Sequence, residues 1–380
     1  MPTVLSFDDL DNLIEGAAFM GSGGGGPLPL ARSLLATMKQ QGMNPTLVEW
    51  AELPANYRVA TTAGIGSPNA AESVQSPFTT APKRMIEALE SALGYSIECL
   101  IPGETGPMNS LIPMMAAAQL GKPVLNGDGA GRAMSTLAMS TFNAVAPIQP
   151  YLLGNETVTP EDQVTAQLTV HTPEQADALT RGVVSEASFG SSGAFATWPS
   201  TVGKLAQVAV KGSVGQAIDV GRLLKQVRAQ GVDPLPALQN YFGGRMHCLY
   251  TGTLTQVDSH TAQGFDITQI RMACDGQPGL TLYALNESMM AWRDDLAHPL
   301  AVGPDSLCWV TENGVPFTNA TLSDFMGPAA PKLHLVGLSA VTQILTPNIL
   351  AAYRAALSPM GYPGPYQSMS YWEEAEHGRT

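Results

Sequence analysis

The opening forty residues carry apolar positions at the spacing of two helices, separated by a glycine-rich stretch. A serine and two aspartates within residues 6–9 form a helix start signal, and apolar side chains then recur three and four residues apart up to Ala18. We expect this first helix to stop at Gly21–Gly26, where five of six residues are glycine. A second helix is predicted from about Leu28 to Gln41.

Between residues 46 and 132 the pattern changes to strands that alternate with amphipathic helices. Strand, helix, strand, helix, strand is the order of βαβ units, and it predicts a parallel sheet. Ligands of such sheets bind beyond the carboxyl ends of the strands. We therefore expect three glycine-rich loops, 64–69, 102–109 and 126–132, to meet at one edge of the sheet.

The second half begins with a predicted strand at 164–172, a helix at 173–189 and a long helical stretch at 202–231. From about Phe242 short alternating runs, separated by Gly, Asp and Asn, predict an antiparallel barrel or sandwich.

These patterns predict an α/β N-terminal domain with a mainly parallel sheet and a smaller, all-β, barrel-like C-terminal domain. We place the α/β ligand-binding domain at 1–240 and the β-rich domain at 241–329. Residues 330–360, with the apolar run "KLHLVGLSAV", are a candidate return to the first domain, and 361–380 are expected to form an irregular tail.

Composition and charge narrow the classes of function. The 380 residues carry a net charge of −13, and no Lys/Arg cluster supplies the basic footprint of a nucleic-acid protein or of an anionic membrane surface. No apolar run reaches the roughly 18 residues of a membrane span. Four scattered cysteines and an acidic start without a secretory pattern favour the cytoplasm. Homo-oligomerisation is expected only from its general frequency among enzymes.

Four segments carry a family resemblance, which extends to Phe317: "FMGSGGGGP", "AGIGSPNAAES", "IPGETGPMNSLIPMMAAAQLGKPVLNGDGAGRA" and "VKGSVGQAIDVGRLL". In this order and spacing they resemble the S-methyl-thiohydantoin desulfurase family. The resemblance implies an N-terminal α/β domain and a C-terminal β domain. It also implies hydrolysis at a five-membered hydantoin-like ring, with loss of sulfur from the carbon between two nitrogens.

Two departures from the family pattern bear on activity. Met134-Ser135-Thr136 stands where the family usually has Phe-Pro-Glu, and Pro27 stands where an acidic residue is common. A lost carboxylate that is catalytic or binds metal would change the substrate or remove the activity.

The glycine run is not a phosphate loop, because no Lys-Ser/Thr follows it, and it is not a dinucleotide fingerprint, because the segment before it is helical. One interpretation is that backbone N–H groups of Gly23, Gly24, Gly25 and Gly26 bind an anion or a carbonyl oxygen of the substrate. The alternative is a tight turn between two helices, packed against the sheet.

The loops supply the candidate polar groups. Asp128 and Glu104 are the candidate general bases, and Arg132 is a candidate clamp for a substrate carboxylate. The alternatives are an Asp128–Arg132 pair that only fixes its loop, a turn-capping Glu104, and Asn109 as the N-cap of the following helix. The remaining substrate-binding candidates are Gly66, Asn109 and Asn126.

The sequence does not decide whether the protein binds a metal ion. A bound Zn²⁺ or Co²⁺ would suit hydrolysis with thiolate release. His247 and Cys248 are adjacent, but on a strand their side chains point to opposite faces. His171 and the Cys274-Asp275 pair are single candidates, and no GxSxG elbow occurs.

Three hypotheses follow. The preferred one is a hydrolase of the thiohydantoin or hydantoin type acting on a small-molecule substrate. The second is a non-catalytic binding or assembly subunit that keeps the pocket. A nucleotide-dependent enzyme is the least favoured, because both nucleotide fingerprints are missing.

Overall fold

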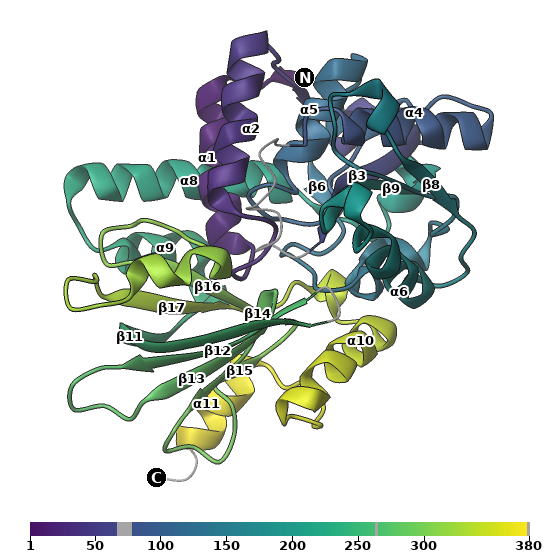
Figure 1. Cartoon of the computed structure of the whole chain (residues 1–380). Helices are drawn as coiled ribbons and strands as arrows, with labels where there is room; N and C mark the ends of the chain where they lie inside the picture. The colour runs from purple at the N-terminus through teal and green to yellow at the C-terminus, as the bar shows by residue number, and fades with distance from the viewer. Residues whose placement is uncertain (67–77, 263–264, 378–380) are drawn as a thin grey trace.

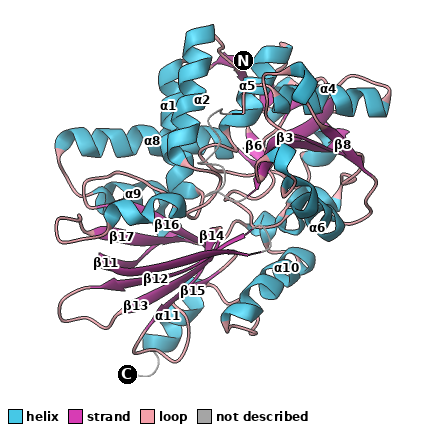
Figure 2. Cartoon of the chain, viewed as in Figure 1, coloured by secondary structure: helices cyan, strands magenta, loops and turns pink. Residues whose placement is uncertain are grey.

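The computed structural model describes residues 1–66, 78–262 and 265–377, and in them two large sheets and one small two-stranded sheet have helices packed around them (Figure 1). The strands of the larger sheet lie within residues 3–201 and those of the smaller sheet within residues 246–338, and Figure 2 shows them as two separate groups. Among the residues that the structure describes, no helix is both long and apolar enough to cross a lipid bilayer.

The larger sheet has eight strands in the order β1-β2-β5-β4-β3-β9-β7-β8. Only β2, β5, β4 and β3 pair in parallel, and the other pairings are antiparallel. The sheet is therefore mixed, because the long strand β9, which the sequence did not indicate, runs against β3. The strands are β1 (Thr3–Val4), β2 (Thr46–Val48), β3 (Arg58–Gly66), β4 (Cys99–Leu100), β5 (Val124–Leu125), β7 (Tyr151–Gly154), β8 (Thr165–Leu168) and β9 (Ser192–Thr201). A separate two-stranded sheet joins β6 (Gly127–Asp128) to β10 (Val210–Lys211).

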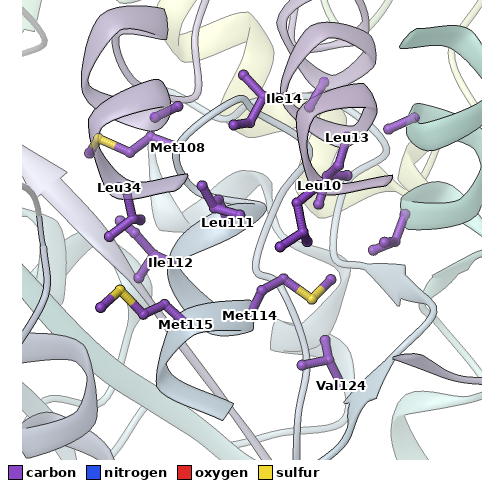
Figure 3. Packing of buried hydrophobic residues seen from close by; sticks show 14 of the residues in the cluster. Leu10, Leu13, Ile14, Leu34, Met108, Leu111, Ile112, Met114, Met115 and Val124 are labelled. Carbon is purple, nitrogen blue, oxygen red and sulfur yellow. The ribbon is translucent and has the colours of Figure 1, made fainter. Parts of the chain in front are cut away.

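Helices cover both faces of this sheet because its strands bury alternate side chains on opposite sides. In neighbouring pairs such as Leu47 and Val48, or Leu152 and Leu153, the first residue joins one apolar cluster and the second joins another. Figure 3 shows the first cluster, where Leu10, Leu13 and Ile14 approach the side chains of the helix that begins at Leu111. The helices are α1 (Phe7–Met20), α2 (Leu28–Gln41), α4 (Ala81–Leu93), α5 (Leu111–Leu120), α6 (Pro173–Val184), α7 (Val202–Leu205), α8 (Ser213–Gln230), α9 (Pro234–Phe242), α10 (Pro347–Leu357) and α11 (Met369–His377).

The predicted ends of the first two helices are confirmed. Ser6 caps α1 in a reciprocal capping box with Asp9, and α2 ends before Gly42, whose φ of 65° is left-handed. The glycine run therefore lies between two fixed helix ends.

The smaller sheet is antiparallel and curled, with seven strands in the order β15-β14-β13-β12-β11-β17-β16. The apolar run at 332–341, the candidate return to the first domain, forms β17, which pairs with β11 and β16 inside this sheet, while Val336 and Leu338 pack in the apolar cluster of the first helices. The predicted irregular tail also contains α11. The strands are β11 (Met246–Ala262), β12 (Phe265–Ala273), β13 (Leu280–Leu285), β14 (Glu287–Arg293), β15 (Ala301–Val302), β16 (Ser306–Thr311) and β17 (Leu333–Leu338).

Two glycines allow α8 to cross α1 at very short range (Figure 1). A Cβ atom at Gly16 would lie 1.7 Å from the carbonyl oxygen of Ala217, and one at Gly221 would lie 1.9 Å from that of Asn12. No real Cβ contact is this short, so any side chain would separate the helices.

Gly221→Ala is expected to lower the free energy of unfolding by about 3 kcal/mol, the upper range for an overpacked core. Urea unfolding followed by circular dichroism measures it. Gly182→Ala in α6 is the matched control, because a Cβ there meets no atom within 4 Å. It should stabilise the helix by up to about 1 kcal/mol, and equal effects of the two changes would contradict the close crossing.

Candidate functional site

A cavity of about 110 Å³ lies where the glycine run, the carboxyl ends of β3 and β4, and the start of β14 meet. Two of the three predicted loops contribute to its wall, through residues 64–66 and 103–109. Residues 67–69 of the first loop lie outside the described residues. The third loop contributes only its continuation, residues 134–137. The walls of the cavity are largely apolar and aromatic, and they carry the three carboxylates of Glu104, Asp177 and Glu287.

One short segment, Met134–Leu137, touches all three carboxylates. The N–H of Met134 donates to Glu104 Oε2 at 2.7 Å, and the hydroxyl of Ser135 donates to Glu287 Oε2 at 2.6 Å. The N–H of Leu137 donates to Asp177 Oδ2 at 3.0 Å. This is the segment at which the sequence departs from the family pattern, and Thr136 in it lines the cavity.

Glu104 and Glu287 form an interacting pair of buried carboxylates. Burial, and then the charge of Glu287, raise the pKa of Glu104 to about 8. Burial also raises the pKa of Glu287, while the hydrogen bond from Ser135 and the charge of Arg132 act in the opposite direction. Because the charge of Glu287 favours a proton on Glu104, the pair can combine one acid with one base.

Asn109 connects Glu104 to the sheet. Its Nδ2 donates to Glu104 Oε1 at 2.7 Å, and its Oδ1 accepts from the N–H of Gly64 at 3.0 Å. The prediction of Asn109 as a helix N-cap is wrong, because Ser110 occupies that position at the start of α5. Asn109 and Gly66 both line the cavity.

Other segments of the chain pack so closely against the glycine run that its residues have no room for side chains. A Cβ at Gly24 would lie 2.2 Å from Glu287 Oε1, and one at Gly25 would lie 2.2 Å from the Cα of Gly106. Gly23, Gly25 and Gly26 also adopt φ values of 80°, 79° and 95°, which other residues rarely take. The backbone N–H of Gly25 bonds to the Glu287 carboxylate. The anion beside the run is therefore a side chain of the protein itself.

Gly25 and Gly26 line the cavity, whereas Gly23 and Gly24 border a neighbouring one on the side of β11 and β12. The run thus forms part of the wall between two hollows.

Asp128, Arg132 and Asn126 lie outside the wall of the cavity. Asp128 Oδ1 accepts from the N–H groups of Ala130 and Gly131, at 2.7 and 2.5 Å, and its Oδ2 accepts from the hydroxyl of Thr105. These bonds fix the loop, and they give no support to the prediction of Asp128 as a base.

Arg132 is fully buried and joins the two sheets. Its guanidinium donates to main-chain oxygens of Ala133, Ser288, Pro304 and Asp305, so the predicted clamp on a substrate carboxylate finds no support in its contacts. Asn126 similarly connects Glu49 to the N-terminus of α8, through the N–H of Gly215.

Sequence reasoning missed Glu287, Asp177, Ser135 and Trp198. The available signal for Glu287 was a glutamate inside the apolar run from Leu285 to Trp292. Trp198 lines the cavity with a φ of 52°, a strained conformation for a large side chain, which is common at functional sites.

Metal binding by the earlier candidates finds no support in the geometry. Within the described residues, no group of three or more His, Cys, Asp and Glu side chains is arranged to hold a metal ion. The ring of His247 bonds instead to Glu373 at 2.7 Å and to Ser339 at 3.3 Å.

Comparison with known proteins gives matches to one family over most of the chain. Residues 8–159 match the model described as the S-Me-THD-like N-terminal domain, and residues 171–325 match the S-Me-THD-like C-terminal domain. A crystal structure of a protein from Chromobacterium violaceum is 26% identical, with a TM-score of 0.82, and the match covers 97% of this chain and 100% of that one. No curated protein matches the chain.

Proposed function

The chain belongs to the S-Me-THD-like family, that of the S-methyl-thiohydantoin desulfurases, and we propose that it is a hydrolase that removes sulfur from a thiohydantoin or S-methyl-thiohydantoin. In the proposed reaction, water attacks the ring carbon between the two nitrogens. The observation that carries the proposal is that Glu104 and Glu287, two buried carboxylates that interact through their charges, line the same small, mostly apolar cavity.

The two carboxylates take different roles. Arg132 favours the ionised form of Glu287, whereas the charge of Glu287 favours a proton on Glu104. Glu287 therefore accepts the proton of the attacking water as its oxygen bonds to the ring carbon. Glu104 donates its proton toward the departing methylthio group, the carbon–sulfur bond breaks, and hydantoin and methanethiol are released. Glu104 thus serves as the acid rather than as the base predicted from the sequence.

The apolar wall suits this chemistry. Phe78, Phe195 and Trp198 line the cavity. Aromatic walls hold a flat ring by stacking and keep bulk water from the carboxylates, which strengthens their electrostatic effect.

The direct test incubates the purified full-length chain with thiohydantoins and S-methyl-thiohydantoins, with and without added Zn²⁺ or Co²⁺. A thiol reagent measures methanethiol or sulfide, and mass spectrometry measures the hydantoin. We expect thiol and hydantoin in equal amounts. Absence of both products across the panel would overturn the desulfurase proposal, and ring opening of a hydantoin would redirect it to amide hydrolysis.

A second candidate function is a non-catalytic binding or assembly subunit. Thr136 favours it, because it lines the cavity where the family pattern has a glutamate. This alternative predicts a higher unfolding temperature with hydantoins but no product, and any turnover that depends on Glu104 excludes it.

A further inference from the structure

Asp177 is a third carboxylate of the cavity, and neither step of the proposed reaction uses it. It lies on α6, its side chain is 6% exposed, and its Oδ2 accepts from the N–H of Leu137 at 3.0 Å. Its second oxygen, Oδ1, accepts a hydrogen bond from none of the described residues, and it does not belong to the fully buried atoms that lack a partner, so it is accessible from the cavity. A carboxylate oxygen that is accessible from a mostly apolar cavity and has no donor from the protein can accept a hydrogen bond from a ligand that brings one.

The guanidinium of Arg181, the arginine nearest to Asp177 in the sequence, does not donate a hydrogen bond to Asp177 Oδ1. Arg181 lies one turn further along α6 and packs its guanidinium over the ring of Phe265, 4.5 Å from the ring centre. Its charge acts on Asp177 only from a distance, and burial still raises the pKa of Asp177 to about 7.

The charges around the cavity restrict the ligand further. Three carboxylates line it, and no Lys, Arg or His does so among the described residues. An anionic substituent would meet repulsion without a compensating partner, whereas a cationic one would be attracted.

We propose that Asp177 is a subsite for a positively charged substituent of the substrate ring, so that cationic substrates are preferred over neutral and anionic ones. The inference rests on the proposed function and adds the substrate class. Phe195 and Trp198 line the same cavity, and aromatic rings attract a cation that lies over their faces. An ammonium or guanidinium group at the end of a short aliphatic chain fits this combination of apolar wall and terminal carboxylate.

The experiment compares three S-methyl-thiohydantoins whose ring substituents have similar length: aminobutyl, butyl and carboxypropyl. For the wild-type protein we expect kcat/KM for the aminobutyl compound to exceed that for the butyl compound about tenfold or more, with the carboxypropyl compound lowest. Asp177→Asn keeps an acceptor for Leu137 and should abolish the preference for the cation. Glu174→Gln is the matched control, because it removes a charge from an exposed position of the same helix and should keep the preference.

The outcomes separate the two proposals. Turnover with no preference for the cation, or with preference for the anion, overturns the inference and leaves the proposed function intact. If no compound is turned over, the proposed function fails, and calorimetric binding of hydantoins with the same three substituents decides the inference. Equal affinities, or no binding at all, then overturn it. The wild-type comparison stands even if Asp177→Asn does not fold.

Discussion

Glu104→Gln and Glu287→Gln each lower kcat for S-methyl-thiohydantoin hydrolysis by about 10²–10⁴-fold, the range for loss of a general acid or base. Glutamine keeps the size of each side chain but removes the proton transfer. Because the two groups are proposed to act together as one acid–base pair, the double variant should be little worse than either single variant. Steady-state kinetics at neutral pH, with thiol release as the readout, measures all three.

The pH dependence adds a second readout for the pair. The pKa of Glu104 is raised to about 8, so its proton, and with it the activity, should be lost as pH rises through about 8. A raised carboxyl pKa also means that the folded protein binds this proton more tightly than the unfolded chain. Its contribution to stability therefore falls as pH rises from about 4.5 to 8. At pH 8 Glu104→Gln should consequently unfold at no lower a temperature than wild type. A large loss of stability together with the loss of activity would indicate a structural role instead.

The local parts of the fold could be predicted from the sequence because they depend on neighbouring residues. Ser6 and Gly42 mark helix ends through capping and a left-handed φ, and both predictions are confirmed. The parallel pairing of β2, β5, β4 and β3 likewise follows from the βαβ order. Strand β9 and the placement of β17 could not be predicted, because strand pairing between distant segments has no local signal.

The candidate site was predictable only where glycine-rich loops follow parallel strands. Glu104 and Asn109 were found in this way, and both line the cavity. Asp128 looked equivalent in the sequence, but its carboxylate turns back onto its own loop. Glu287 comes from a strand of the other sheet, and only the folded chain brings it to Gly24.

Gly24→Ala is expected to reduce kcat/KM about 100-fold, although the change lies outside the chemistry itself. The new Cβ would lie 2.2 Å from Glu287 Oε1 and 2.4 Å from its Cγ, so the carboxylate must shift. Displacement of a reacting group by about 1 Å commonly costs about 10²-fold in rate. The φ of Gly24 is not left-handed, so alanine is acceptable to the backbone and the effect should arise from the contact with Glu287.

Two comparisons show whether Gly24 acts through Glu287. Gly244→Ala is the control, because a Cβ at that exposed glycine meets no atom within 4 Å, and it should leave kcat/KM unchanged. Gly24→Ala combined with Glu287→Gln should be no slower than Glu287→Gln alone, since a carboxylate already removed cannot be displaced. If the two losses multiplied instead, Gly24 would act on the substrate directly, through the backbone of the glycine run. That result would restore the interpretation in which the N–H groups of the run bind the ligand, and the crowding of Glu287 would then be incidental to catalysis.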